Sequence, residues 1–155
     1  MLTTFRRPLT HVLAGVIFVL AALVAASALT MPAAEAMTPD KRERVLHVAA
    51  SKKGTPYRYG ATGPRAFDCS GYTRWVFSRV GERLPRTSRA QAGAAKRIKK
   101  SSRRTGDLVF FRNHGRVYHV GIYAGRHTIW HSPRTGERVK RTRIWTSNLS
   151  YGRVR

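Results

Sequence analysis

Residues 67–77 read Phe67-Asp68-Cys69-Ser70-Gly71-Tyr72-Thr73-Arg74-Trp75-Val76-Phe77, and they include the only cysteine of the 155-residue chain. Apolar residues recur after this cysteine at helical spacing: Tyr72, Trp75, Val76 and Val80. The spacing predicts a helix that begins at Cys69 and runs to about residue 80. Unpaired N–H groups and the positive end of the helix dipole at that terminus favour the thiolate, which is the nucleophilic form. The alternative is a buried structural cysteine that packs as a small hydrophobe.

Residues 1–36 have the pattern of a signal peptide. Arg6 and Arg7 precede an apolar run from 12 to 29, and Ala34-Glu35-Ala36 is a small-x-small cleavage motif. Cleavage after Ala36 predicts a secreted or cell-envelope domain over residues 37–155. The alternative is an uncleaved membrane anchor, because the run approaches the length of about 18–20 residues that spans a bilayer. Contact with a membrane is expected only in that case.

The predicted domain has the length of a single domain with its own core. Thirty Lys and Arg against seven Asp and Glu give the chain a formal net charge of +23, which favours binding to anionic polymers. For an exported protein these partners are anionic polymers of the cell wall, and the export signal makes nucleic acid an unexpected partner. One cysteine excludes an intramolecular disulfide and a thiolate metal cage, and the histidines lack zincin spacing, so we expect no metal and no cofactor.

The local patterns place helices before strands. Thr38 and Pro39 predict a helix start, and Ser88 with Gln91 forms a capping-box pattern for a short helix through residue 95. Residues 96–104, from Lys96 to Arg104, are expected to be a solvated basic loop. Apolar runs predict strands at 108–111, 117–124, 127–131 and 139–145. This order predicts an α+β fold, with the helices packed on one side of an antiparallel meander.

Two of the six histidines lie within predicted strands. A hairpin centred on Gly125 would place His119 directly opposite His131 on one face of the sheet. One imidazole could then orient the other, which would serve as the base that a catalytic cysteine needs. The alternative is a pair of core histidines with satisfied hydrogen bonds.

Several blocks together resemble the NlpC/P60 family of cell-wall cysteine peptidases. In chain order they are Pro56-Tyr57, Phe67-Asp68-Cys69-Ser70-Gly71, Leu84-Pro85-Arg86-Thr87-Ser88, Gly106-Asp107-Leu108-Val109-Phe110-Phe111, His119-Val120-Gly121-Ile122-Tyr123 and Trp130-His131-Ser132. The resemblance spans about residues 41–145. It implies a papain-like α+β fold and hydrolysis of peptidoglycan stem peptides, usually at the bond from D-glutamate to a diamino acid.

The resemblance also implies roles for individual residues. Cys69 matches the nucleophile, His119 the base and His131 the polar third residue of the catalytic group. Tyr57 matches a tyrosine that lines the cleft and helps to hold the oxyanion. Asp68 and Ser70 match residues that bind the amine of a free stem N-terminus, although Asp68 is also a natural helix cap.

The sequence departs from the family pattern at two positions, and two rival functions remain open. Tyr59 stands where the family often has Trp, and Ser132 stands where it often has a small residue. One rival is a related amidase or acyltransferase on the same scaffold. The other is an exported cationic module that binds the cell wall without catalysis.

Overall fold

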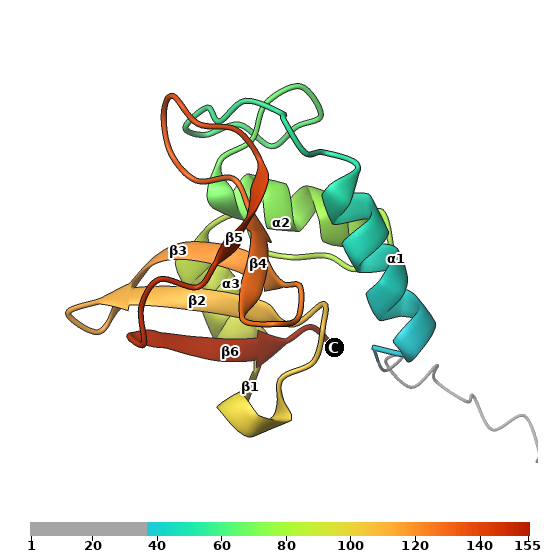
Figure 1. The fold of residues 1–155 in the computed structure, drawn as a ribbon, viewed down its shortest axis with the longest axis vertical. Coiled ribbons are helices and arrows are strands. Elements are labelled where there is room, and N and C mark those ends of the chain that lie inside the picture. Colours follow the sequence, from blue (N-terminus) through green and yellow to red (C-terminus); the bar gives the residue numbers. More distant parts are fainter. Residues whose placement is uncertain (1–36) are drawn as a thin grey trace, which may run out of the picture. The chain divides into compact units, whose positions relative to one another are not determined.

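The computed structural model describes residues 37–155, so the predicted signal peptide and the alternative anchor lie outside the described residues. Within 37–155 the helices are α1 (Pro39–Ala50), α2 (Cys69–Ser78) and α3 (Ser88–Ala94), with a short 3₁₀ helix, η1 (Lys100–Ser102). The strands are β1 (Lys96–Ile98), β2 (Leu108–Asn113), β3 (Arg116–Tyr123), β4 (Thr128–His131), β5 (Lys140–Arg143) and β6 (Leu149–Arg153). The strands form one antiparallel sheet in the order β1-β6-β2-β3-β4-β5 (Figure 1). The predicted α+β class is confirmed.

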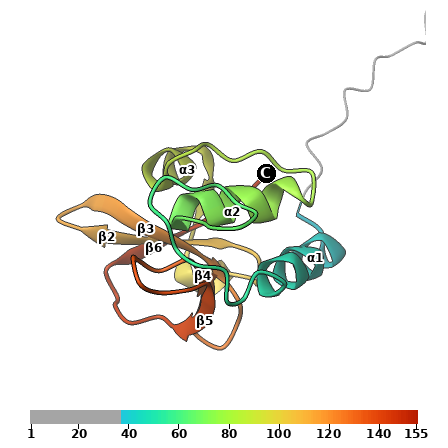
Figure 2. The same ribbon diagram turned by 90° about the horizontal axis from the view of Figure 1, so that it is seen from above.

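Helices α2 and α3 lie over the same side of the sheet, as the view from above shows (Figure 2). Alternate residues of β2 explain why the sheet has two apolar faces. Leu108 and Phe110 belong to the large core cluster that includes Tyr72 and Phe77 of α2. Val109 and Phe111 point the other way, into a smaller cluster of the sheet's second face that also contains Ile129, Ile144 and Tyr151.

The N-termini of α1 and α2 follow the capping rules. Thr38 Oγ1 accepts from the N–H of Lys41 at 3.2 Å, with Pro39 in the first turn, as predicted. Asp68 Oδ1 accepts from the N–H of Gly71 at 2.6 Å, which makes Cys69 the first residue of α2. A side chain at position 71 would bring its Cβ to 2.1 Å from the carbonyl oxygen of Ala61, so only glycine allows the preceding loop to pack on this helix.

The end of α2 and the start of α3 differ from the prediction by one or two residues. Helix α2 ends at Ser78 because the next residues form tighter turns that lead to Gly81 at φ +83°. Helix α3 is capped by Thr87, whose Oγ1 accepts from the N–H of Ala90, so the predicted capping box at Ser88 is wrong. The amide of Gln91 is instead fully buried and donates to the carbonyls of Ser70 and Pro85, both at 2.9 Å.

Two strands correct the predicted topology. Lys96–Arg104 is not a loop throughout, because it contains β1 and η1. The sequence pattern also missed β6, which pairs with both β1 and β2 and so separates them in the sheet (Figure 1). Only β2 to β5 form the predicted meander. Both strands depend on pairing between segments about fifty residues apart, and local periodicity carries no information on such pairing.

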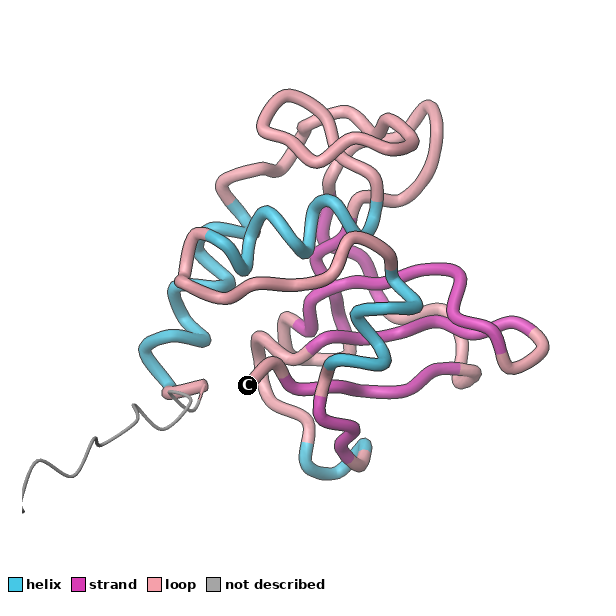
Figure 3. Tube along the Cα trace, turned by 180° about the vertical axis from the view of Figure 1, so that it is seen from behind, coloured by secondary structure: helices cyan, strands magenta, loops and turns pink. Residues whose placement is uncertain are grey.

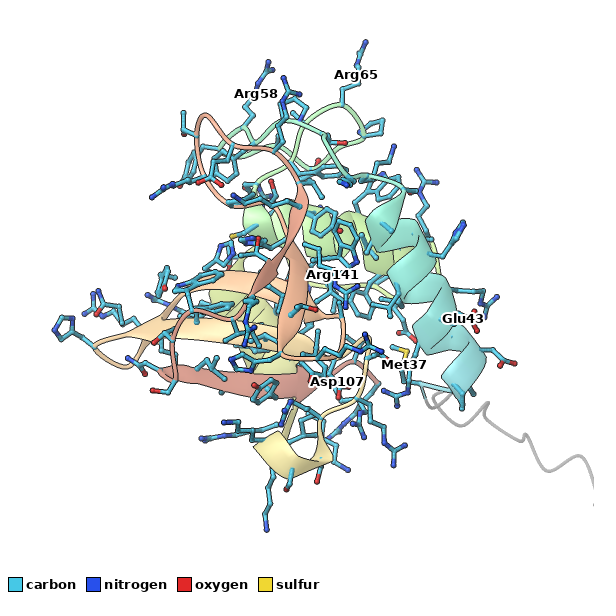
Figure 4. The ribbon with its side chains drawn as sticks, viewed as in Figure 1. Met37, Glu43, Arg58, Arg65, Asp107 and Arg141 are labelled. Atoms are coloured by element: carbon cyan, nitrogen blue, oxygen red, sulfur yellow. The ribbon has the colours of Figure 1, made fainter. Side chains whose placement is uncertain are left out.

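A buried carboxylate ties the first helix to the sheet. Asp107 is fully buried, and Figure 4 labels it near the strand ends on the side of α1. Its oxygens accept two bonds from Arg153 of β6, at 2.8 and 2.9 Å, and Arg42 of α1 lies 3.5 Å away. Removing one partner of such a buried pair costs about 3–5 kcal/mol. This ion-pair cluster fixes α1 against the C-terminal strand.

Candidate active site

Four of the predicted site residues meet at one cavity of about 500 Å³. Cys69 comes from the start of α2, His119 from β3 and His131 from the end of β4, whereas Tyr57 comes from the loop before α2. Loops 51–68 and 132–139 lie side by side in Figure 3, and they contribute Tyr57, Pro133, Arg134 and Glu137 to the lining of the cavity. Backbone bonds join these loops, and one of them runs from the N–H of Tyr57 to the carbonyl of Glu137 at 2.9 Å. Residues far apart in the sequence therefore share one concave surface.

The two histidines are in direct contact. Nε2 of His119 lies 2.8 Å from Nδ1 of His131, and both side chains are buried. Strand β3 pairs with β4 through Ile122–Trp130 and Tyr123–Ile129. This register makes the histidines diagonal neighbours on one face, so the predicted directly opposite placement is wrong. Diagonal side chains still reach one another when they are as long as imidazole.

The register differs because the turn between β3 and β4 holds three residues and is centred on Arg126. The N–H of Ala124 bonds to the carbonyl of Thr128 at 2.9 Å and closes the turn around residues 125–127. Arg126 and His127 have φ values of 47° and 59°, which are uncommon for residues with a side chain. The sequence pattern instead predicted a centre at Gly125, the residue midway between His119 and His131.

Thr142 is a third member of this polar chain that the sequence did not indicate. Its Oγ1 lies 3.3 Å from Nε2 of His131, on the neighbouring strand β5. The pairing of Ile129 with Thr142 brings it to the same face as His131. Threonine is common in strands, so no local signal could have distinguished this one.

Both imidazoles are neutral at neutral pH. Burial, with a smaller contribution from His131, lowers the pKa of His119 to about 3. Burial and the positive charge of Lys140 lower the pKa of His131 to about 4. Two neutral rings share a hydrogen bond by one donating and the other accepting, so each ring has one protonated nitrogen. The pair can accept an additional proton but carries no positive charge at rest.

The thiol of Cys69 is also neutral at rest. Burial and the nearby charge of Asp68 raise its pKa, and the N–H groups of Val120 and Ser70 oppose this only in part. The prediction that the helix terminus favours the thiolate is therefore wrong for the free protein, because desolvation outweighs the dipole.

Aromatic side chains form part of the cavity wall. The ring of Trp145 stacks on Phe111 with a centroid separation of 4.2 Å, and half of its surface is exposed. Its centroid lies 5.9 Å from that of His119 and 5.5 Å from that of His131. Burial and the neighbouring Cys69 raise the pKa of Tyr57, which keeps its hydroxyl protonated as a donor. The sequence indicated Tyr57 but not Trp145 as a wall of the site.

Asp68 and Ser70 do not line the cavity. Asp68 accepts from the N–H groups of Gly60 and Gly71, and it forms a two-bond ion pair with Arg86. Burial pushes the pKa of Asp68 upward, but Arg86 and these N–H groups outweigh it and lower the pKa. Ser70 donates to Asp68 at 3.3 Å and is itself buried. Their role in binding a substrate amine stays a prediction, since an amine would have to compete with Arg86.

Within residues 37–155, no group of three or more His, Cys, Asp or Glu side chains is arranged to hold a metal ion. The same residues contain no helix that is both long and apolar enough to cross a bilayer.

Comparison with known proteins agrees with this geometry. Residues 54–153 match the model of the NlpC/P60 family. The chain belongs to the NlpC/P60 family. All four predicted residues that line the cavity fall within this NlpC/P60 region.

Curated relatives of this chain are named as endopeptidases. A probable endopeptidase of Corynebacterium glutamicum is 43% identical over 110 residues, which cover 69% of this chain and 51% of that protein. The bifunctional muramidase/DL-endopeptidase CwlT of Bacillus subtilis is 37% identical over 123 residues, which cover 75% of this chain and 37% of CwlT. The chain therefore spans about half, or less, of the length of these curated relatives.

Solved NlpC/P60 structures have the same fold. The NlpC/P60 domain of the peptidoglycan hydrolase SagA aligns with a TM-score of 0.67 and 32% identity, and the match covers 74% of this chain and 98% of that domain. An NlpC/P60 family protein from Bacillus cereus aligns with a TM-score of 0.70 and 28% identity, over 73% of this chain and 40% of that chain.

Proposed function

We propose that this protein is a peptidoglycan endopeptidase that cleaves stem peptides by cysteine nucleophilic catalysis. The observation that carries the proposal is one cavity lined by Cys69, at the start of α2, and by His119, which is bonded to His131. Membership of a family whose named relatives are endopeptidases supports the substrate class.

The first half of the reaction is acylation of Cys69. Because Nε2 of His119 is bonded to His131, Nδ1 is the nitrogen left to take the thiol proton. The sulfur attacks the amide carbonyl carbon, and the N–H of Cys69 with the hydroxyl of Tyr57 stabilises the oxyanion. His119 then returns the proton to the leaving amine as the carbon–nitrogen bond breaks.

The second half is hydrolysis of the thioester. His119 removes a proton from water, the resulting hydroxide attacks the acyl carbon, and the carbon–sulfur bond breaks. The sulfur recovers a proton from His119, and the products are a free carboxylic acid and the original thiol. Throughout both halves, neutral His131 accepts from the Nε2–H of His119 and donates its own Nε2–H to Thr142, which fixes the tautomer and the ring plane.

The bond we propose is the one from D-glutamate to the diamino acid of the stem. The family resemblance supports this choice, and the DL-endopeptidase name of a relative is consistent with it. A related amidase or acyltransferase would give different products. Mass spectrometry of digested muropeptides distinguishes them, because hydrolysis at this bond leaves a free D-glutamyl carboxylate.

The decisive experiment replaces the nucleophile. We expect Cys69→Ala to abolish release of peptides from purified peptidoglycan while the circular dichroism spectrum stays unchanged. Residual hydrolysis by this variant would remove Cys69 from the mechanism. A different pair of results would favour a cationic binding module. In that case the natural protein would hydrolyse nothing, and it would bind walls as strongly as Cys69→Ala does.

We further propose that residues 1–36 are a signal peptide and that residues 37–155 act in the cell envelope. The net charge of +23 favours docking on anionic wall polymers. Such docking weakens with salt, so binding to purified walls that is equal at low and high ionic strength would contradict it.

A further inference from the structure

A second cavity of about 810 Å³ lies on the sheet face that bears the smaller apolar cluster. It is bounded by β1 and η1 on one side and by residues 144–151 on the other. Three cationic side chains line it, namely Arg97, Lys99 and Lys100, and all three residues are exposed. Its lining includes no Asp or Glu. We call this space the basic cavity.

The positive charge of the basic cavity is not neutralised by the rest of the described chain. Within residues 37–155, the carboxylates that form ion pairs do so with other basic side chains, such as Asp107 with Arg153 and Asp68 with Arg86. No ion pair joins Arg97, Lys99 or Lys100 to a carboxylate in that range. The cavity is therefore suited to an anionic occupant.

A buried polar atom independently indicates an occupant. Tyr151 lines the basic cavity and is only 4% exposed, and its hydroxyl has no hydrogen-bond partner within the described residues. A buried hydroxyl without a partner costs about 1–3 kcal/mol, so native proteins seldom leave one in that state. The hydroxyl is covered in the structure, so a ligand oxygen accepts from it only when the side chains around it move aside.

Trp145 connects the basic cavity to the candidate active site. It lines both cavities, and half of its surface is exposed. A molecule whose peptide bond lies at Cys69 can therefore continue past Trp145 toward Lys99. This continuity indicates that the anionic occupant is part of the substrate itself rather than an unrelated molecule.

We propose that the basic cavity is a distal subsite that binds the carboxylates of a second stem peptide, carried by the same peptidoglycan molecule as the stem at Cys69. The proposal rests on the proposed function for the identity of the substrate. It gives the basic segment from Lys96 to Arg104 a role in recognition, although a charge run alone carries no such meaning. The site distinguishes cross-linked substrate, which has two stems, from a single stem.

The test compares two defined muropeptides, a single stem and a cross-linked dimer of stems. In the triple variant Arg97→Ala, Lys99→Ala, Lys100→Ala we expect KM for the dimer to rise roughly tenfold. The reason is the loss of three exposed ion pairs with the substrate, each of modest strength. We expect kcat for the dimer and both constants for the single stem to stay unchanged. The matched control is Arg44→Ala, Arg74→Ala, Arg89→Ala, which removes the same charge from exposed helical positions and should leave both substrates unaffected.

A second variant keeps the test independent of net charge. Tyr151→Phe removes only the unpartnered hydroxyl, and we expect a smaller rise in KM for the dimer alone, of about two- to fivefold. An equal loss for the single stem and the dimer, or no loss for either, would overturn the proposal. So would a triple variant that loses binding to a phosphate polymer such as polyphosphate but still binds the dimer normally.

Calorimetry on the Cys69→Ala background separates this proposal from the proposed function. If the natural protein hydrolyses neither muropeptide, the proposed function fails, and binding of the dimer still reports on the subsite. The subsite is supported if the triple substitution at Arg97, Lys99 and Lys100 weakens binding of the dimer and the control substitution does not. If both triple substitutions weaken binding of the dimer equally, the binding is general charge attraction and the subsite proposal is wrong.

Discussion

Nε2 of His119 lies 2.8 Å from Nδ1 of His131 across a three-residue turn. This contact leaves Nδ1 of His119 as the nitrogen available to a thiol. In the proposed mechanism, a neutral imidazole rather than a carboxylate therefore orients the base. The pair is buried, and burial keeps both rings uncharged at neutral pH.

Replacement of His131 should lower the rate of catalysis rather than substrate binding. We expect His131→Ala to reduce kcat by about 10²-fold with little change in KM, because the tautomer of His119 is no longer fixed. His131→Asn should retain more activity, since its side-chain oxygen can accept from Nε2 of His119. Steady-state kinetics on a soluble stem peptide measures both. Equal activity of the two variants would show that orientation by an acceptor at this position is unimportant.

The pH dependence of Cys69 alkylation tests whether the resting group is a thiol. Because burial raises its pKa, we expect the rate with iodoacetamide to rise steadily with pH and to reach half its maximum at a higher pH than in the unfolded protein. The same protein unfolded in guanidinium should titrate near pH 8.5. Cys69 is the only cysteine, so the label reports a single site. A rate that is already constant between pH 5 and 8 would instead indicate a resting thiolate–imidazolium pair.

The two buried histidines should make the fold sensitive to mild acid. Their folded pKa values, about 3 for His119 and about 4 for His131, lie below the ordinary value of 6.5 that applies in the unfolded chain. As the pH falls below 6.5, the unfolded state binds protons that the folded state does not, so the free energy of unfolding decreases. The stability is fully present above pH 6.5 and is lost toward pH 4 and below. At pH 5 each histidine should lower the free energy of unfolding by about 1–2 kcal/mol.

Urea unfolding at pH 7 and pH 5 measures this effect. The double variant His119→Gln, His131→Gln is the control, and its stability should change much less between the two pH values. An equal change in the double variant would assign the acid sensitivity to other groups.

The ion pair between Arg86 and Asp68 should decide whether a free stem amine is recognised. While Arg86 and two backbone N–H groups occupy the carboxylate, we expect similar KM values for stem peptides with a free and an acetylated N-terminus. In Arg86→Gln, the released carboxylate should favour the free amine several-fold, as expected for a partly exposed ion pair. The matched variant Arg65→Gln changes a residue that points away from the fold in Figure 4 and should alter neither value. A natural protein that already prefers the free amine would show that substrate displaces Arg86, as the predicted roles of Asp68 and Ser70 require.

The sequence by itself determined the features that depend on near neighbours in the chain. Asp68 caps a helix that begins at Cys69, and Thr38 with Pro39 starts the first helix, because capping involves residues only three positions apart. The short apolar runs identified β2 and β3, and the ordered motifs identified the family. Tyr57, Cys69, His119 and His131 were all chosen from these patterns, and they line one cavity.

The tertiary structure alone decided the features that depend on distant pairing and on desolvation. Strand β6 separates β1 from β2, the turn centred on Arg126 makes the histidines diagonal neighbours, and Thr142 reaches His131 from another strand. These follow from hydrogen bonds between segments remote in sequence, to which local periodicity is insensitive. Burial likewise turned the expected thiolate of Cys69 into a thiol, because the cost of desolvating a charge depends on everything packed around it.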